Sequence, residues 1–219
     1  MRTTYMRDAI LDTYESGGSN LTAAAKYVGL ITAVTDMRAG TVTEASYTGY
    51  GTRPALTLGA VGNTSPVGGR QRANDVLIGF PQNTGSSQDV IGWTIHTAST
   101  AGSITDINFL DADPPVIAIA NDTSGELLTC PAHGLSADQR VFVLAAPGLL
   151  LPAGLAENNA YYVLAAGLTT DLLALSATSG GAAVNITAKG GVQLIPYTSR
   201  TIANLATPEF AIGALVLQD

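Results

Sequence analysis

Charged residues, cysteine and histidine are all scarce in this chain. Of its 219 residues only 12% are charged, one is a cysteine and two are histidines. The lone Cys130 excludes a disulfide within the chain and fits a reducing cell. His96 and His133 are far apart in sequence, and neither has another ligand residue at a spacing typical of zinc sites. These absences exclude a disulfide scaffold and argue against a zinc site.

Long apolar runs are missing as well. The longest uncharged apolar stretch, residues 141–156, contains two prolines and two glycines and is too short to cross a bilayer. Residues 1–8 lack the apolar core that a signal peptide requires. We therefore expect no membrane partner, and a protein that stays in the cytoplasm of its host until an assembly uses it.

Charge is distributed unevenly along the chain. Residues 1–72 hold seven Lys or Arg against five Asp or Glu, whereas residues 73–219 hold three against twelve, so the formal charge changes from +2 to −9. Because binding to phosphate backbones depends on Lys and Arg, nucleic acid is not an expected partner. Arg70 and Arg72 could pair with acidic groups of a protein partner, although a solvated loop is the commoner outcome for exposed arginines.

Residues that could carry catalysis do not form a recognisable set. Asp111 and Asp113 resemble half of a calcium loop, but the other oxygen ligands are missing, and their position before two prolines favours a solvated connector. Cys130 has no basic residue nearby to stabilise a thiolate, which favours a small buried side chain. The glycine-rich segment 62–69 lacks the Gly-Lys-Ser/Thr ending of a phosphate-binding loop. We expect no enzyme activity, no catalytic residue, no metal and no cofactor.

Short apolar runs separated by turn residues predict a mainly β protein. The expected strands are rich in β-branched or aromatic residues and lie at 26–32, 52–58, 75–80, 89–97, 104–110, 116–120, 127–130, 140–144, 161–164, 172–176 and 183–187. The apolar spacing over 4–15, followed by two glycines, predicts one short N-terminal helix. This pattern favours an antiparallel β-sandwich or jelly-roll-like core.

The strand at 89–97 makes a specific prediction about side-chain direction. Ile91, Trp93 and Ile95 alternate and should point together into the core. His96 has the opposite phase, so we expect it to be exposed. His133 lies in an Ala-His-Gly-Leu turn and should bond to nearby backbone.

A proline-containing segment at 111–115 marks a boundary between two parts. Because a second boundary falls near 193–197, and the residues that follow are too few for a domain, we expect an insertion. In this interpretation 1–114 and 196–219 form one core, and 115–195 form a small all-β domain inserted into it. Two domains in linear order are the alternative.

Two sets of short sequence segments, called phrases here, each occur in a fixed order that resembles known phage proteins. The first set resembles the small all-β module that recurs in tail and capsid proteins of tailed bacteriophages; its phrases lie at 121–129, 132–141, 151–155, 159–164, 173–178 and 180–187. The second resembles small virion proteins described as tail fibre or head decoration; its phrases lie at 8–12, 26–33, 47–56, 80–85, 90–98, 200–202 and 210–215. The resemblance implies a structural protein of the virion. Copies of this protein are expected to contact each other and other virion proteins.

Three functions are compatible with this resemblance. A capsid decoration (cement) protein that binds the major capsid protein and stabilises the head suits a small, compact β protein, and it is the function we expect. A tail fibre or tail-tip protein for host attachment is the alternative, although long fibres usually have repeats that this chain lacks. A glycan binder has less support, because aromatics make up only 6% of the residues and the visible clusters are Tyr161–Tyr162 and Tyr47 with Tyr50. In each case the mildly basic N-terminal part is expected to anchor the protein, with the acidic insert projecting.

Overall fold

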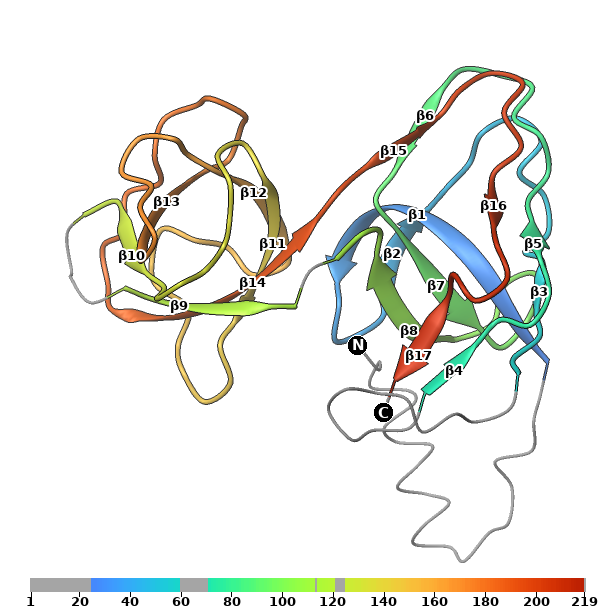
Figure 1. The fold of residues 1–219 in the computed structure, drawn as a ribbon, viewed down its shortest axis with the longest axis horizontal. Coiled ribbons are helices and arrows are strands. Elements are labelled where there is room, and N and C mark those ends of the chain that lie inside the picture. The colour runs from blue at the N-terminus through green and yellow to red at the C-terminus, as the bar shows by residue number, and fades with distance from the viewer. Residues whose placement is uncertain (1–24, 60–70, 113, 121–124, 219) are drawn as a thin grey trace, which may run out of the picture. The chain divides into compact units, whose positions relative to one another are not determined.

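The computed structural model describes residues 25–59, 71–112, 114–120 and 125–218, and every regular element in these ranges is a β-strand (Figure 1). The chain divides into two compact units. The first contains the residues up to Asn108 and those from Ser199 onward, and the second runs from Phe109 to Thr198.

The first unit is built on an antiparallel sheet whose strand order is β2-β1-β7-β8, with β3 pairing along the same edge of β1 as β2. Its strands are β1 (Lys26–Asp36), β2 (Thr41–Glu44), β3 (Ala55–Leu56), β7 (Gly92–His96) and β8 (Ile104–Phe109). The β1–β7 register places Leu30 opposite Trp93 and Gly29 opposite Thr94. Strand β7 is therefore central, with a partner strand on each side.

Three short ladders join the C-terminal residues to the first unit. They pair β15 with β6, β16 with β5 and β17 with β4. These strands are β4 (Gln71–Ala73), β5 (Ile78–Gly79), β6 (Gln88–Val90), β15 (Arg200–Ile202), β16 (Glu209–Phe210) and β17 (Val216–Gln218). Because each ladder combines a strand before Phe109 with a strand after Thr198, the first unit is assembled from both ends of the described chain.

Both faces of β7 are covered, which confirms one prediction and overturns another. Ile91, Trp93 and Ile95 are buried as expected. His96, expected to be exposed, is only 2% exposed. That prediction was wrong because alternation implies an exposed face only for a strand with one buried face, and β7 is buried at all five positions.

The second unit is a closed antiparallel barrel with the strand order β10-β13-β12-β11-β14-β9 (Figure 1). Its strands are β9 (Val116–Ala120), β10 (Leu127–Thr129), β11 (Arg140–Ala145), β12 (Asn159–Val163), β13 (Leu172–Ser176) and β14 (Gly190–Tyr197). The β9–β10 pair closes the ring. Closure removes the unpaired sheet edges that would otherwise invite aggregation.

Inward side chains fill the barrel with a continuous apolar core. Small residues such as Ala118 and Ala120 on β9 share this core with larger ones such as Leu173 and Leu175 on β13, and all four are buried. Burial of this kind contributes about 25 cal/mol for each Å² of apolar surface removed from water. The core also includes Cys130, as its predicted role as a small buried side chain requires.

Most of the predicted strands are present, but 183–187 is not a strand, and several observed strands, among them β14, were not predicted. The segment 183–187 contributes only a single bridge, from Ile186 to Gly125. Ile186 is part of the core and Val184 packs against it, while Val184 N–H donates to the Leu175 carbonyl at 2.8 Å. Conversely, the region 193–197 was expected to be a return segment, yet it belongs to β14, which has eight residues and pairs with both β9 and β11.

The expected mainly β, antiparallel class is confirmed, while a sandwich or jelly roll is not seen. A five-stranded sheet with short ladders and a closed barrel take its place in the described residues. The predicted helix at 4–15 lies outside those residues. A compact unit is not yet a domain that folds by itself, so the assignment of 115–195 as an inserted domain stays a prediction.

The chain enters and leaves the barrel unit at neighbouring points. Thr198 N–H donates to the Leu110 carbonyl at 3.1 Å, and the Thr198 hydroxyl donates to the Asp111 carboxylate at 2.8 Å. Phe109 stacks on Tyr197 with ring centroids 4.7 Å apart. A segment can be inserted into a protein with little disturbance when the chain enters and leaves it at neighbouring points such as these.

Candidate functional site

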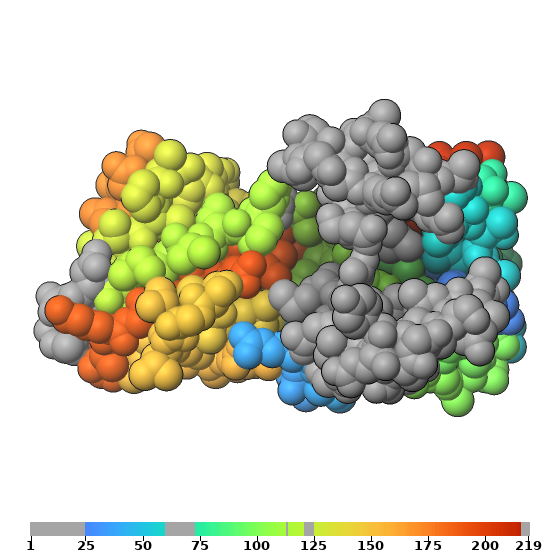
Figure 2. Space-filling view, turned by 90° about the horizontal axis from the view of Figure 1, so that it is seen from below, coloured from blue at the N-terminus to red at the C-terminus, as the bar shows by residue number. Residues whose placement is uncertain are grey.

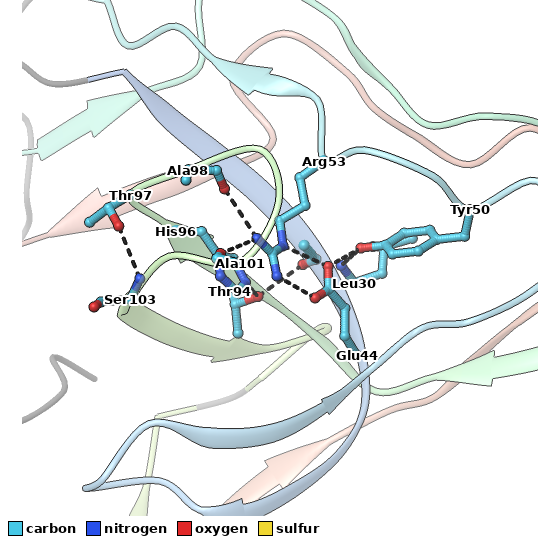
Figure 3. Close-up of polar contacts among 11 residues, drawn as sticks. Leu30, Glu44, Tyr50, Arg53, Thr94, His96, Thr97, Ala98, Ala101 and Ser103 are labelled. Atoms are coloured by element: carbon cyan, nitrogen blue, oxygen red, sulfur yellow. Dashed lines mark hydrogen bonds and ion pairs between the residues drawn. The ribbon is translucent and has the colours of Figure 1, made fainter.

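The densest polar cluster in the described residues is centred on an ion pair between Arg53 and Glu44 (Figure 3). Glu44 ends β2, and Arg53 lies in the loop before β3. Arg53 Nε donates to Glu44 Oε1 at 2.8 Å and Nη2 donates to Oε2 at 2.6 Å, which is the two-pronged geometry that guanidinium groups favour with carboxylates. The Arg53 side chain is 11% exposed and that of Glu44 is 24% exposed.

Tyr50 and two carbonyls complete the hydrogen bonding of this pair. The Tyr50 hydroxyl donates to Glu44 Oε1 at 2.6 Å and accepts from Leu30 N–H at 3.0 Å. Arg53 Nη1 donates to the carbonyls of Ala98 at 3.1 Å and Ala101 at 2.6 Å. The cluster therefore ties the loop between β2 and β3 to β1 and to the turn between β7 and β8.

The surroundings of Glu44 and Tyr50 shift the pKa values of both groups. Burial by itself raises the pKa of Glu44, but hydrogen bonds from Arg53 and Tyr50 outweigh it, and the net pKa is below the ordinary 4.5. The pKa of Tyr50 is raised, by burial first and then by its bond to the Glu44 carboxylate. At neutral pH the cluster thus holds one carboxylate, one guanidinium and one neutral phenol.

His96 lies beside this cluster with one nitrogen unpaired. Its Nε2 is 2.8 Å from Thr94 Oγ1, whereas Nδ1 is buried without a hydrogen-bond partner. Protonation would place a second N–H in this unpaired position, at a large cost in free energy. Burial, together with the positive charge of Arg53, lowers the pKa of His96 to about 4.

Glycine is required where this cluster crosses β1. A Cβ on Gly29 would lie 2.8 Å from Thr94 Oγ1, 2.9 Å from Glu44 Oε1 and 2.9 Å from His96 Nε2. The polar side chains therefore pack directly on the backbone of β1. Since Glu44, Tyr50 and Arg53 are each bonded to one another or to backbone, the arrangement fastens the loop between β2 and β3 to the sheet.

We expect acid to weaken folding through His96. The folded pKa, about 4, lies below the ordinary 6.5, so the unfolded chain takes up a proton first as the pH falls. The contribution of neutral His96 is complete above pH 6.5 and is lost between pH 6.5 and pH 4, a change of about 3 kcal/mol. Chemical denaturation across this range measures it. His96→Gln should flatten the curve, and equal pH curves for both proteins would contradict the assignment.

The other residues singled out in the sequence are not brought together. His133 accepts Leu135 N–H on Nδ1 at 2.9 Å, and its Nε2 lies 2.9 Å from the Thr169 carbonyl, which confirms its predicted turn role. Burial raises the pKa of the Cys130 thiol. Asp111 accepts the bond from Thr198, while Asp113 and the pair Arg70 and Arg72 fall outside the side chains that the structure describes.

Two other kinds of site are absent from the described ranges. No group of three or more His, Cys, Asp or Glu there is placed to hold a metal ion. Among those same residues, none belongs to a helix long and apolar enough to cross a membrane.

Exposed large apolar side chains lie on both units. Those on the barrel unit are Ile117 (49% exposed), Leu127 (46%), Leu149 (48%) and Leu150 (83%). Figure 2 shows the surfaces of β9 and β14 side by side, with the yellow loop after β11 next to β14. The exposed residues of the first unit are Val76, Leu77, Leu205 and Ile212. Apolar side chains left in water are candidates for contacts with a partner.

One further cluster was missed by reasoning from the sequence. On the outer face of the barrel, the Arg140 guanidinium lies over the rings of Tyr162 and Tyr197, with its Cζ 5.5 Å and 5.4 Å from their centroids. The sequence signal was weak: alternation requires that one of Tyr161 and Tyr162 faces inward but does not say which, and in the structure Tyr161 is the buried one. Nothing in the spacing of Arg140 and Tyr197 indicated that they are neighbours.

Comparison with known proteins identifies the family of the chain. The family model described as Podophage GP4 fiber I protein gp80 matches residues 2–117, which is more than half of the 219 residues. A search of curated proteins found no match. The match agrees with the resemblance to small phage virion proteins noted from the phrases at 26–33, 47–56 and 90–98. The chain therefore belongs to the podophage GP4 fiber I protein gp80 family and is a structural component of a phage virion.

Proposed function

We propose that this protein is a component of the tail fibre and takes part in host attachment. The observation that carries the proposal is the family match, because the family is described as a fibre protein. Capsid decoration, the function expected from the sequence, has no comparable support. The lack of shaft repeats is compatible with a short accessory part of a fibre rather than its long shaft.

The limits of the family match suggest which unit attaches the protein to the particle and which unit projects from it. The match ends at residue 117, at the start of β9, so the family-wide part lies mostly in the first unit and most of the barrel lies outside it. We propose that the first unit attaches the protein to the particle and that the barrel projects. The charge distribution supports this division, since the barrel segment 109–198 holds seven Asp or Glu against Arg140 and Lys189.

The proposed role is non-enzymatic and depends on protein contacts. Glu44 and Arg53, the most strongly coupled charged pair described, are occupied by each other and by backbone. The exposed apolar side chains on both units are suited to contacts with neighbouring virion proteins and with further copies of this chain. Neither nucleic acid nor membrane is part of the proposal.

A protein inventory of purified virions tests the location. A fibre component should be present in a few to some tens of copies and should be labelled by antibody at the tail. Particles that lack it should release their genome on heating as complete particles do, yet adsorb poorly to host cells. Hundreds of copies on the head, together with earlier genome release when the protein is missing, would instead support decoration.

The same inventory tests the division of labour between the units. Residues 116–194 are replaced by a short Gly/Ser linker, which can close the gap because Leu110 and Thr198 are already hydrogen bonded. The shortened protein should still join particles in normal copy number. A deletion variant that folds, as shown by circular dichroism, but is absent from particles would assign attachment to the barrel.

A further inference from the structure

Arg140 is held in a fixed orientation on the barrel surface by aromatic rings. It begins β11, where the register places it opposite Tyr162 of β12 and Tyr197 of β14. Tyr197 is in turn stacked on Phe109 at 4.7 Å with an interplanar angle of 24°. Rings on both sides restrict the rotamers of the long side chain, so little further entropy is lost when its guanidinium binds something.

The guanidinium has no acceptor among the residues that the structure describes. Its Nε is buried without a hydrogen-bond partner. The segment 109–198 offers seven carboxylates and only this one arginine, but no described carboxylate pairs with it. An arginine that is oriented, partly exposed and unpaired is unusual, because an unmet buried donor costs free energy. The two Nη groups, for which no hydrogen bond to a described residue is found, remain as paired N–H donors that an external group could reach.

We propose that Arg140, Tyr162 and Tyr197 form a binding site for a saccharide that carries a carboxylate, such as a uronic acid residue of a host surface glycan. The carboxylate would accept two N–H bonds from the guanidinium fork. The sugar ring would pack its C–H face against the partly exposed Tyr162. An acidic protein side chain would use only the first of these two features, so the saccharide fits the site better.

The surrounding charge narrows the class of ligand. With seven acidic and two basic residues in the segment 109–198, the formal charge there is −5. This field repels a polymer with dense negative charge, such as a sulfated glycan, more strongly than a sugar with one carboxylate. The proposed ligand is therefore a saccharide with an isolated carboxylate and no other charge.

Titration of the full-length protein with two matched sugars tests the proposal. Methyl β-D-glucuronide carries the carboxylate, and methyl β-D-glucoside lacks it. The Nε–H signal of Arg140 in a nitrogen-15 spectrum, assigned by its loss in Arg140→Lys, reports contact directly in the unaltered protein. We expect a saturable shift with the glucuronide and none with the glucoside. Arg140→Gln should weaken binding about tenfold or more, as measured from sugar signals or by calorimetry.

Lys189→Gln is the matched control, because it removes the same charge from an exposed position of the same unit. It should leave the affinity for glucuronide almost unchanged. The proposal is wrong if the Arg140 signal ignores the glucuronide, if the glucoside acts equally, or if both charge variants weaken binding alike. It is also wrong if the purified protein ignores glucuronide while folded Arg140→Gln protein fails to join particles, since the carboxylate would then belong to a neighbouring virion protein.

This inference goes beyond the fibre proposal and does not depend on it. The sugar titration uses isolated protein, whereas the tail location is tested on particles. Failure of either one therefore leaves the other intact.

Discussion

Replacement of Trp93 by alanine should destabilise the first unit by about 3–5 kcal/mol, the range for loss of a buried large aromatic side chain. Trp93 is 7% exposed and meets Phe210 of β16 edge-to-face, with ring centroids 6.5 Å apart. Phe210 also contacts Phe80 at 6.0 Å. Because β16 is one of the C-terminal strands, the substitution should loosen the attachment of the chain end as well as leave a cavity.

The measurement is chemical denaturation followed by circular dichroism, since Trp93 is the one tryptophan and its removal abolishes the usual fluorescence signal. Trp93→Phe should lose less stability, because part of the ring contact with Phe210 survives. Leu150→Ala, at an 83% exposed position, should change stability by no more than about 0.5 kcal/mol. Unaltered stability of Trp93→Ala combined with failure to join particles would make Trp93 a contact residue instead of a core residue.

Glu44→Ala should have an effect of similar size, about 3 kcal/mol, for an electrostatic reason. The substitution leaves the Arg53 guanidinium, 11% exposed, without its counter-charge. It also removes the acceptor of the Tyr50 hydroxyl. We place the loss at the lower end of the range for broken buried pairs because Glu44 is itself 24% exposed.

Amide hydrogen exchange locates this effect. Leu30 N–H and Arg53 N–H, which donate to the Tyr50 hydroxyl and the Ser99 carbonyl, should exchange faster in Glu44→Ala. The pair Glu44→Leu with Arg53→Met should cost less than the sum of the two single changes, since no lone charge remains. Asp75→Ala, which removes an exposed carboxylate, is the control. Additive losses in the double variant would mean that the two groups are not coupled.

Local composition predicted those strands that are recognisable from their own residues, without knowledge of their partners. Residues 116–120, 140–144 and 172–176 are runs of apolar and β-branched side chains, and each is a barrel strand. β14 could not be found in this way, because Gly190, Gly191 and Pro196 all disfavour strands. The structure shows why they are there: a Cβ on Gly190 would meet the Leu150 carbonyl at 2.3 Å. Pro196 lies beyond Leu194, where the pairing of β14 with β9 ends.

The polar cluster was out of reach of sequence reasoning for a different reason. Glu44 and Arg53 come together through the conformation of the loop between β2 and β3, and Arg53 is fixed by a turn at Ala98 and Ala101. No periodic pattern encodes such a meeting. The exposure of His96 was mispredicted because alternation gives the phase of a strand but not how many of its faces are covered.

The pairing of the C-terminal strands has a consequence for how the protein is made. β4, β5 and β6 emerge from the ribosome early, yet their partners β17, β16 and β15 are synthesised only after the entire barrel. The barrel pairs its strands only with one another, so it can close while the first unit still has open strand edges. Open edges on a partly made chain are prone to wrong pairing, and distant partners fold slowly. We expect early closure of the barrel to shorten the effective distance between β6 and β15, because it would bring Leu110 and Thr198 together before the last strands arrive.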